Sequence, residues 1–264
     1  MIRLVCIDVD GTLVGSSGTV PDEVWDAAAR ARDAGLHLAL CSGRPALGLA
    51  RELAERLDPG GWHVFQNGAS LVNLGLGESR SHGIETAAVD RLVERARRTG
   101  RALELYGDRG YVVECSTGVT RRHARLLGVP FEARPFESLD GPVVRAQWLV
   151  PHAEVPEILR EPNAGLHLSP SLSPVMPDIT FVNMTPAGVD KASAVRDLAA
   201  LHDVPLERVM MVGDGANDLG VMRVVGHPVA MGNAEPEVFG VAHRRVGHVD
   251  EGGLVDALDL ALRI

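Results

Sequence analysis

Residues 4–12 read LVCIDVDGT, and this stretch decides the fold class. Its first four residues are apolar and do not alternate with polar ones, which is typical of a central strand in a parallel sheet covered on both faces. Asp8 and Asp10 follow at the carboxyl end of this strand, where ligands bind in such sheets, and Gly11 permits a sharp turn. Two carboxylates this close repel each other unless a cation lies between them. The stretch predicts an α/β fold with a candidate cation site; a helix cap plus a turn acid is the simpler alternative.

Composition excludes several classes of function. The net charge is -9 without a basic block and only 4% of residues are aromatic, which argues against nucleic-acid binding. No apolar run reaches the roughly 20 residues of a membrane span, and residues 1–3 lead into a strand instead of a signal peptide, so we expect a cytoplasmic protein. The three cysteines and ten histidines show no zinc-ligand spacing. We expect a monomer or a homodimer.

The two outer parts of the chain alternate strands and helices, which predicts a doubly wound parallel sheet. They cover residues 1–83 and 185–264 and form the expected core domain. The expected strands are 3–9, 36–41, 63–66, 209–212 and 229–231, with a hairpin at 70–83; the expected helices are 21–35, 45–57, 188–202, 216–225 and one from 253.

The middle of the chain, residues 84–184, has a different pattern and predicts an inserted α+β domain. The segment 169–177 contains three prolines and is interpreted as a boundary. The expected helices are 86–99, 118–127 and 152–160, and the expected strands are 102–106, 111–115, 143–150 and 165–169.

Two further clusters fall at the carboxyl ends of core strands. Ser42 and Gly43 stand where a strand gives way to a helix, so free backbone N–H groups and the Ser42 hydroxyl could bind a phosphate; Ser42 could equally cap the helix. Asp214 and Asp218 flank a glycine turn after another strand and could complete a ring of oxygen ligands with Asp8 and the Asp10 backbone. Such ligands favour Mg²⁺.

Lys191 is the only lysine among 26 cationic residues. The chain uses arginine wherever a general positive charge is sufficient. A lysine offers a compact ammonium on a flexible stem, which can reach a phosphoryl oxygen where a planar guanidinium does not fit. This choice favours a functional role for Lys191.

These motifs resemble those of the haloacid dehalogenase-like superfamily of phosphohydrolases, and the resemblance spans nearly the whole chain. An insertion between the second and third motifs looks like a type-II cap, and its α+β content is similar to the Cof-type subgroup, IIB. Asn67-Gly68-Ala69 and Gly188-Val189-Asp190-Lys191 also fit that subgroup. The motifs are Asp8-x-Asp10-Gly11-Thr12, Ser42-Gly43-Arg44, Lys191 and Gly213-Asp214-x-x-Asn217-Asp218.

The resemblance implies a role for each motif residue. Asp8 is implied as the nucleophile, forming an aspartyl-phosphate, and Asp10 as the general acid and base. The phosphoryl group would be held by Ser42, Gly43, Lys191 and Asn217, and Mg²⁺ by Asp8, Asp10, Asp214 and Asp218.

The expected activity is hydrolysis of a small phosphorylated metabolite, with a sugar or polyol phosphate as the first choice. A phosphorylated cofactor such as pyridoxal phosphate or flavin mononucleotide is the second choice. A phosphomutase with the same cap, and a ligand-binding regulator with a vestigial site, remain alternatives.

The strands of the inserted domain divide into two faces because side chains alternate along a strand. The apolar face, expected beneath the helices, carries Leu103, Leu105, Val144, Ala146, Trp148, Leu166 and Leu168. The opposite face is expected either to be solvated or to read the leaving group of the substrate. Its candidate substrate residues are Tyr106, Arg145, Gln147 and His167.

Overall fold

The computed structural model describes residues 1–173 and 175–264. The chain divides into two compact units, which are described separately. The core unit comprises Met1–Arg44, Ala50–Arg80 and Asp190–Ile264, and the inserted unit comprises Pro45–Leu49 and Ser81–Val189. Among the described residues, no helix has the length and apolar character needed to span a membrane.

The core unit is built on a five-stranded parallel sheet in the order β13-β12-β11-β1-β2. The central strands β1 and β11 are apolar and buried along their whole length, as expected for a sheet covered on both faces. The predicted α/β class is confirmed. The strands are β1 (Leu4–Ile7), β2 (His37–Leu40), β11 (Val209–Gly213), β12 (His227–Ala230) and β13 (Arg244–Arg245).

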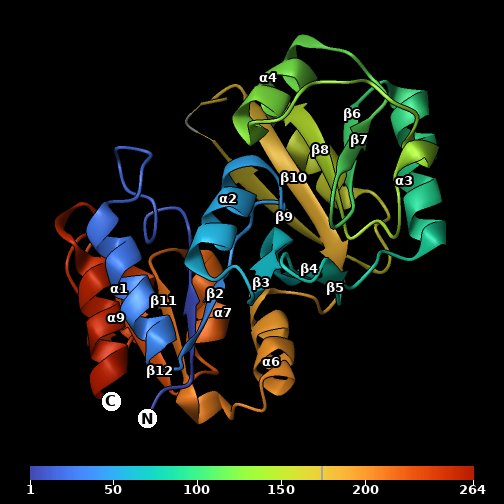
Figure 1. Cartoon of the computed structure of the whole chain (residues 1–264). Helices are drawn as coiled ribbons and strands as arrows, with labels where there is room; N and C mark the ends of the chain where they lie inside the picture. The colour runs from blue at the N-terminus through green and yellow to red at the C-terminus, as the bar shows by residue number, and fades with distance from the viewer. Residues whose placement is uncertain (174) are drawn as a thin grey trace. The chain divides into compact units, whose positions relative to one another are not determined.

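Helices cover both faces of this sheet (Figure 1). Helices α1 (Asp22–Asp33) and α9 (Gly253–Arg263) lie side by side on one face. On the other face, Leu4 and Cys6 of β1 share a buried apolar cluster with residues of three helices. These helices are α6 (Lys191–Leu201), α7 (Leu219–Met222) and α8 (Pro236–Val241). A further helix of the chain, α2, spans Gly48–Leu57.

The third predicted strand does not extend the parallel sheet. Strand β3 (Trp62–Phe65) makes one isolated parallel bridge to the chain after β2 and then pairs antiparallel with β4 (Ser70–Asn73), which pairs with β5 (Glu78–Ser79). The reversal follows from backbone geometry, because Gln66, Asn67 and Gly68 all have positive φ, at 55°, 55° and 101°. The expected hairpin after residue 70 is present as the β4–β5 pair.

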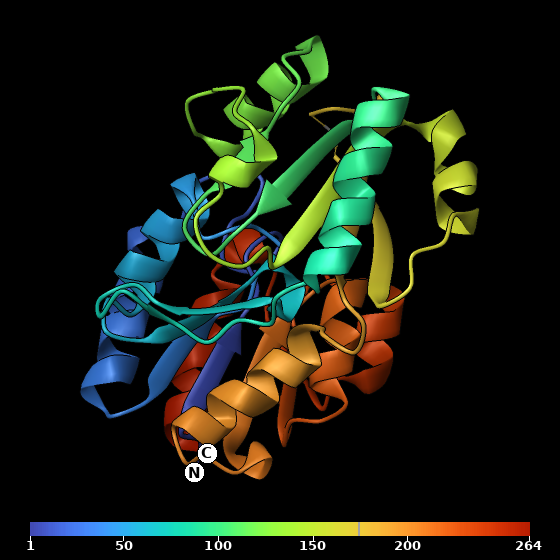
Figure 2. The same ribbon diagram turned by 90° about the vertical axis from the view of Figure 1, so that its right-hand side faces the viewer.

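The inserted unit holds a five-stranded antiparallel sheet in the order β7-β6-β8-β10-β9. Helix α3 runs along this sheet (Figure 2). The strands are β6 (Ala102–Tyr106), β7 (Tyr111–Val113), β8 (Arg145–Pro151), β9 (Leu166–Leu172) and β10 (Ile179–Pro186), and the helices are α3 (Thr86–Thr99), α4 (Gly118–Leu127) and α5 (Val155–Arg160).

The interpretation of the proline-rich segment as a domain boundary is wrong. Residues 166–172 form β9, which pairs with β10 from Thr180↔Leu172 to Pro186↔Leu166, so the segment connects two strands of one sheet. Pro170 is tolerated because β9 is the edge strand of the sheet. Pro174 lies outside the described residues. Strand β10, which the sequence analysis missed, is buried over Ile179–Thr185.

Helices cover both faces of the inserted sheet. Leu103, Ala146 and Trp148 pack with residues of α3 and α5, so the expected apolar face is confirmed. Apolar side chains of α4 pack against the opposite face, beside Ala102, Leu149 and Phe181. The expectation that solvent could cover this second face is therefore wrong.

Candidate active site

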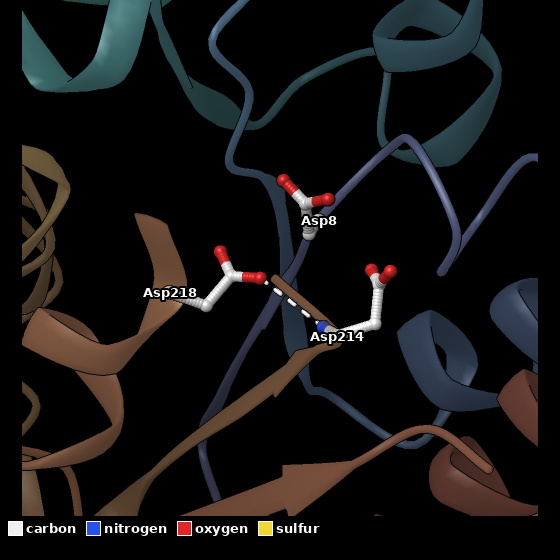
Figure 3. Close-up of side chains that lie close together, drawn as sticks. All are labelled: Asp8, Asp214 and Asp218. Atoms are coloured by element: carbon white, nitrogen blue, oxygen red, sulfur yellow. Dashed lines mark hydrogen bonds between the residues drawn. The ribbon is translucent and has the colours of Figure 1, made fainter. Parts of the chain in front are cut away.

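Three carboxylates meet at the carboxyl edge of the core sheet. Asp8 directly follows β1 and Asp214 directly follows β11, and these strands are parallel neighbours, so both side chains emerge at the same edge. Asp218 joins them from the short helical turn Ala216–Asp218. One carboxylate oxygen from each of the three lies within 4.8 Å of the others (Figure 3).

Lys191 supplies the positive charge of this cluster. It is the first residue of α6, which Asp190 caps by accepting a 2.7 Å hydrogen bond from the Ser193 N–H. The Lys191 ammonium donates to Asp8 Oδ1 at 2.5 Å and to Asp218 Oδ1 at 2.8 Å. Only 2% of the Lys191 side chain is exposed. The lone lysine of the chain is thus buried between two acids.

Asp218 and Asp214 have different surroundings. Asp218 Oδ2 accepts hydrogen bonds from the backbone N–H groups of Asp214 and Gly215, both at 3.2 Å, so this carboxylate orders the turn after β11. Asp214 Oδ1 accepts one from the Thr12 hydroxyl at 2.8 Å. Gly11 has a positive φ of 84°, and a Cβ there would lie 2.1 Å from Asp214 Oδ2, so the turn favours glycine.

The cluster carries more negative than positive charge. Burial, with the neighbouring carboxylates Asp218 and Asp214, raises the pKa of Asp8 to about 8, although Lys191 opposes this shift. Burial also raises the pKa of Asp214, to about 6. Burial alone would lower the pKa of Lys191, but Asp8 and Asp218 outweigh it and raise that pKa. Three carboxylates facing one ammonium leave the site short of positive charge.

A divalent cation fits this arrangement. The donors are hard carboxylate oxygens, which suit Mg²⁺ or Ca²⁺ and not softer metals. A bound cation would favour the ionised carboxylates and so offset the burial and the repulsion that raise the pKa values of Asp8 and Asp214. The predicted aspartate cluster is therefore assembled, with Asp8, Asp214 and Asp218 as its members.

The Asp10 carboxylate lies outside this cluster. Both of its oxygens are bound by Arg44, through Nε at 3.0 Å and Nη2 at 2.5 Å. The Asp10 side chain is 62% exposed, in contrast to that of Asp8 at 8%. The ligand predicted at this position is the backbone of Asp10, not this carboxylate.

The loop that carries Ser42 differs from the expected strand-to-helix junction. Helix α2 begins at Gly48, so Ser42 does not cap it and the helix start does not supply the N–H groups expected there. The Ser42 hydroxyl instead accepts a 3.0 Å hydrogen bond from the Arg44 N–H. Gly43 lies against the Asn67 side chain. Gly48 has a positive φ of 48°, which a right-handed helix running on from Pro45 cannot contain.

Sequence reasoning assigned no role to two residues that hold the turn after β1. Thr12 binds Asp214, as described above. Asn233 donates to the Gly11 carbonyl at 2.7 Å and accepts from the Val249 N–H at 3.0 Å. Asn233 could have been found, because it follows β12 at the same sheet edge as the other site residues. Asn217, a predicted phosphate ligand, is exposed in the turn that contains Asp218.

Three of the four candidate substrate residues lie together in the inserted unit. Glu104, which is fully buried, accepts hydrogen bonds from the Tyr106 hydroxyl at 2.5 Å and Gln147 Nε2 at 3.3 Å. Arg145 stacks over the Tyr106 ring at 4.1 Å. His167 is exposed on the edge strand β9 and is not part of this cluster. The assignment of these residues to substrate selectivity stays a prediction.

Comparison with known proteins identifies the class. A family model for haloacid dehalogenase-like hydrolases matches residues 5–258, so the chain belongs to this family. The resemblance inferred from the four motifs is confirmed, and the chain is a hydrolase of the haloacid dehalogenase type.

Individual relatives match over nearly their whole length. YxeH of Bacillus subtilis, whose name places it among phosphatases, is 28% identical over 274 residues, 98% of this chain and 97% of its own. The 5-amino-6-(5-phospho-D-ribitylamino)uracil phosphatase YcsE of the same organism is 24% identical over 263 residues, 99% of this chain and 95% of its own.

Solved structures share the fold. The crystal structure of a haloacid dehalogenase-like hydrolase from Bacteroides thetaiotaomicron superposes with a TM-score of 0.87 at 26% identity and covers 98% of this chain and 99% of its own. A subclass IIB sugar phosphatase superposes with a TM-score of 0.78 at 23% identity, covering 99% of this chain and all of its own, which shows the shared fold.

Proposed function

We propose that the chain is a Mg²⁺-dependent phosphomonoester hydrolase that acts through an aspartyl-phosphate on Asp8. The observation that carries this proposal is the 2.5 Å hydrogen bond from the single lysine to Asp8, within a group of three carboxylates at a sheet edge. A buried carboxylate held by an ammonium is a positioned nucleophile, and the surplus negative charge calls for a cation.

In this proposal, Asp8, Asp214 and the Asp10 carbonyl bind Mg²⁺. Asp218 orients the site, because its oxygens already accept hydrogen bonds from Lys191 and two backbone N–H groups. When bound, the cation neutralises charge on the phosphoryl group and favours the ionised form of Asp8. Ser42, Gly43 and Asn217 are proposed to hold the remaining phosphoryl oxygens.

The reaction has two steps. An Asp8 oxygen attacks phosphorus in line with the ester oxygen, the phosphorus–ester bond breaks, and Asp10 donates a proton to the leaving oxygen. Asp10 then accepts a proton from a water molecule, whose oxygen attacks phosphorus and releases phosphate and the free Asp8 carboxylate. Lys191 stabilises the negative charge in both steps.

We propose a sugar or polyol phosphate as the substrate. The chain is similar to a phosphatase whose named substrate carries a phosphorylated ribityl group, which is a polyol phosphate, and to a sugar phosphatase in fold. Hydrogen-bonding side chains in the inserted unit, namely Tyr106, Arg145, Gln147 and His167, are the proposed source of selectivity. Arg145→Ala and Gln147→Ala should then lower kcat/KM for the physiological substrate while sparing a small aryl phosphate.

Phosphate release tests the proposal. The purified protein is assayed on a panel of sugar, polyol and phosphorylated cofactor substrates, with Mg²⁺ and with excess chelator. We expect Mg²⁺-dependent release from at least one polyol or sugar phosphate, without a requirement for a bisphosphate activator. Preferred turnover of pyridoxal phosphate or flavin mononucleotide would replace the substrate class, and a bisphosphate requirement would indicate a phosphomutase. Equal rates in chelator would refute the metal assignment.

A further inference from the structure

Arg44 is a charged residue of the core unit to which the proposed function gives no role. Its guanidinium binds both oxygens of the Asp10 carboxylate, at 3.0 Å from Nε and 2.5 Å from Nη2. This two-point contact fixes the plane of the carboxylate as well as its position, which a single-point donor cannot do. The contact also raises the pKa of Arg44, chiefly through the hydrogen bond to Asp10.

The backbone of Arg44 is itself held on both sides. Its N–H donates to the Ser42 hydroxyl at 3.0 Å, and its carbonyl accepts from the Gln66 N–H at 2.9 Å. The neighbouring Ser42 carbonyl accepts from the Asn67 N–H at 3.0 Å. Gln66 and Asn67, which donate these bonds, both have positive φ, an uncommon backbone conformation. Arg44 therefore starts from a well-anchored backbone.

Stability does not account for this ion pair. The side chains of Arg44 and Asp10 are 35% and 62% exposed, and ion pairs this exposed contribute little to the free energy of folding. Proton transfer, by contrast, depends strongly on orientation, because the donor oxygen must point at the leaving oxygen. No other side chain in the described part of the chain forms a hydrogen bond or ion pair with the Asp10 carboxylate that would fix its direction.

We propose that Arg44 is a positioning residue that orients the Asp10 carboxylate for proton transfer. This inference rests on the proposed function, since it requires Asp10 to act as general acid and base. Arg44 acts through Asp10 and not by binding the phosphoryl group. The alternative role is direct binding of the substrate by the guanidinium. In that case, the effects of substituting Arg44 and Asp10 should multiply, whereas a positioning role predicts that they do not.

The experiment is a double-mutant comparison of Arg44→Ala, Asp10→Asn and the double variant, with Arg44→Lys as the conservative replacement. Two substrates are used with Mg²⁺. One is an alkyl phosphate, whose leaving oxygen must be protonated; the other is p-nitrophenyl phosphate, whose leaving group is a weaker base and depends less on protonation. Arg30→Ala is the matched control, because Arg30 also forms an exposed ion pair in the core unit, at 2.9 Å from Asp259. Thermal unfolding of each variant checks folding.

We expect Arg44→Ala to lower kcat on the alkyl phosphate by about 10- to 100-fold, with KM changed less than about twofold and a smaller loss on p-nitrophenyl phosphate. Arg44→Lys should not restore kcat, because a single ammonium cannot hold both oxygens. In the Asp10→Asn background, Arg44→Ala should cause no further loss. Arg30→Ala should behave as wild type.

Two results would overturn the inference. A raised KM with unchanged kcat, and losses that multiply in the double variant, would place Arg44 on the substrate. Wild-type kinetics in Arg44→Ala would remove any role. Failure of the proposed function has a different signature, since Asp8→Asn would then stay active whatever happens at Arg44.

Discussion

The core unit and the inserted unit each bury carboxylates against a sheet, and the two groups differ in the number of side-chain donors available to each carboxylate. In the core unit, Asp8, Asp214 and Asp218 share one ammonium, that of Lys191. In the inserted unit, Glu104 alone accepts hydrogen bonds from three side chains. These donors are Tyr106, His123 at 2.8 Å and Gln147.

This difference separates a group of carboxylates that needs a ligand from a single carboxylate, Glu104, whose donors all lie in the same unit. The core cluster lacks positive charge until a cation binds, which is costly for folding and useful for chemistry. The Glu104 cluster is complete within the inserted unit and ties α4, through His123, to the sheet. We therefore expect substitutions in the core cluster to change turnover and loss of the Glu104 carboxylate to change stability.

Asp8→Asn should have the largest effect on turnover. The variant removes the nucleophile but keeps the shape of the side chain, and we expect kcat to fall at least about 10³-fold. The measurement is phosphate release with Mg²⁺, with Asp259→Asn, a surface acid of the core unit, as the control. Turnover within tenfold of wild type in a folded Asp8→Asn protein would disprove the nucleophile assignment.

Lys191→Arg should have the second-largest effect on turnover, with a loss of about 100-fold in kcat although the charge is kept. The planar guanidinium cannot occupy the position from which the Lys191 ammonium reaches Asp8 and Asp218. Arg196→Lys, the reverse exchange at an exposed position of the same helix, is the control and should retain activity. Near-normal turnover of Lys191→Arg would show that any cation is sufficient there.

Glu104→Ala should lower stability and leave the chemistry intact. It leaves buried donors of Tyr106, His123 and Gln147 without their acceptor, and we expect a loss of about 3 kcal/mol in unfolding free energy. Denaturant unfolding measures this loss, with Glu132→Ala, an exposed acid of the inserted unit, as the control. The kcat of the folded variant on p-nitrophenyl phosphate should be unchanged. A Glu104→Ala protein with unchanged stability and reduced kcat would show that Glu104 serves the reaction and not the fold.

His63 is a buried titratable residue outside both clusters, and it tests whether burial alone makes stability depend on pH. Burial lowers its pKa to about 4, and its Nδ1 accepts from the Leu40 N–H at 3.1 Å. Because the unfolded state binds the proton near pH 6.5, stability should fall as pH drops from 6.5 towards 4. His63→Gln should remove about 2 kcal/mol of the stability difference between pH 7 and pH 5. His243→Gln, at an exposed histidine, should leave this stability difference unchanged. An equal pH dependence of stability in both variants would contradict the burial argument.

The core site could be predicted because its residues follow apolar strands directly. Asp8, Ser42 and Asp214 each stand one or two residues after a strand, so the edge at which they meet follows from the parallel topology. What could not be predicted was the Arg44–Asp10 pair, because it depends on where side chains point within a loop. The delayed start of α2 was missed because it depends on the backbone conformation of the loop, where Gly48 has a positive φ.

The inserted unit was predicted less completely, because tertiary contacts determine its features. Strand β10 was missed because three prolines preceded it, although an edge strand tolerates Pro170. The burial of Glu104 depends on the packing of α4 against the second face of the inserted sheet. Its partner His123 lies on that helix, 19 residues away in sequence. Alternation identified the two faces correctly but could not show what covers the second.

The most direct test of the central claim is to locate the phosphoryl group on the protein during turnover. Wild-type protein is mixed with Mg²⁺ and substrate, quenched in acid during the steady state, digested and analysed by mass spectrometry. The account predicts phosphorylation at Asp8 alone, absent from Asp8→Asn and accumulating in Asp10→Asn, which lacks the base for the second step. A phosphoryl group on another residue, or full turnover by Asp8→Asn without any phosphorylated residue, would contradict it.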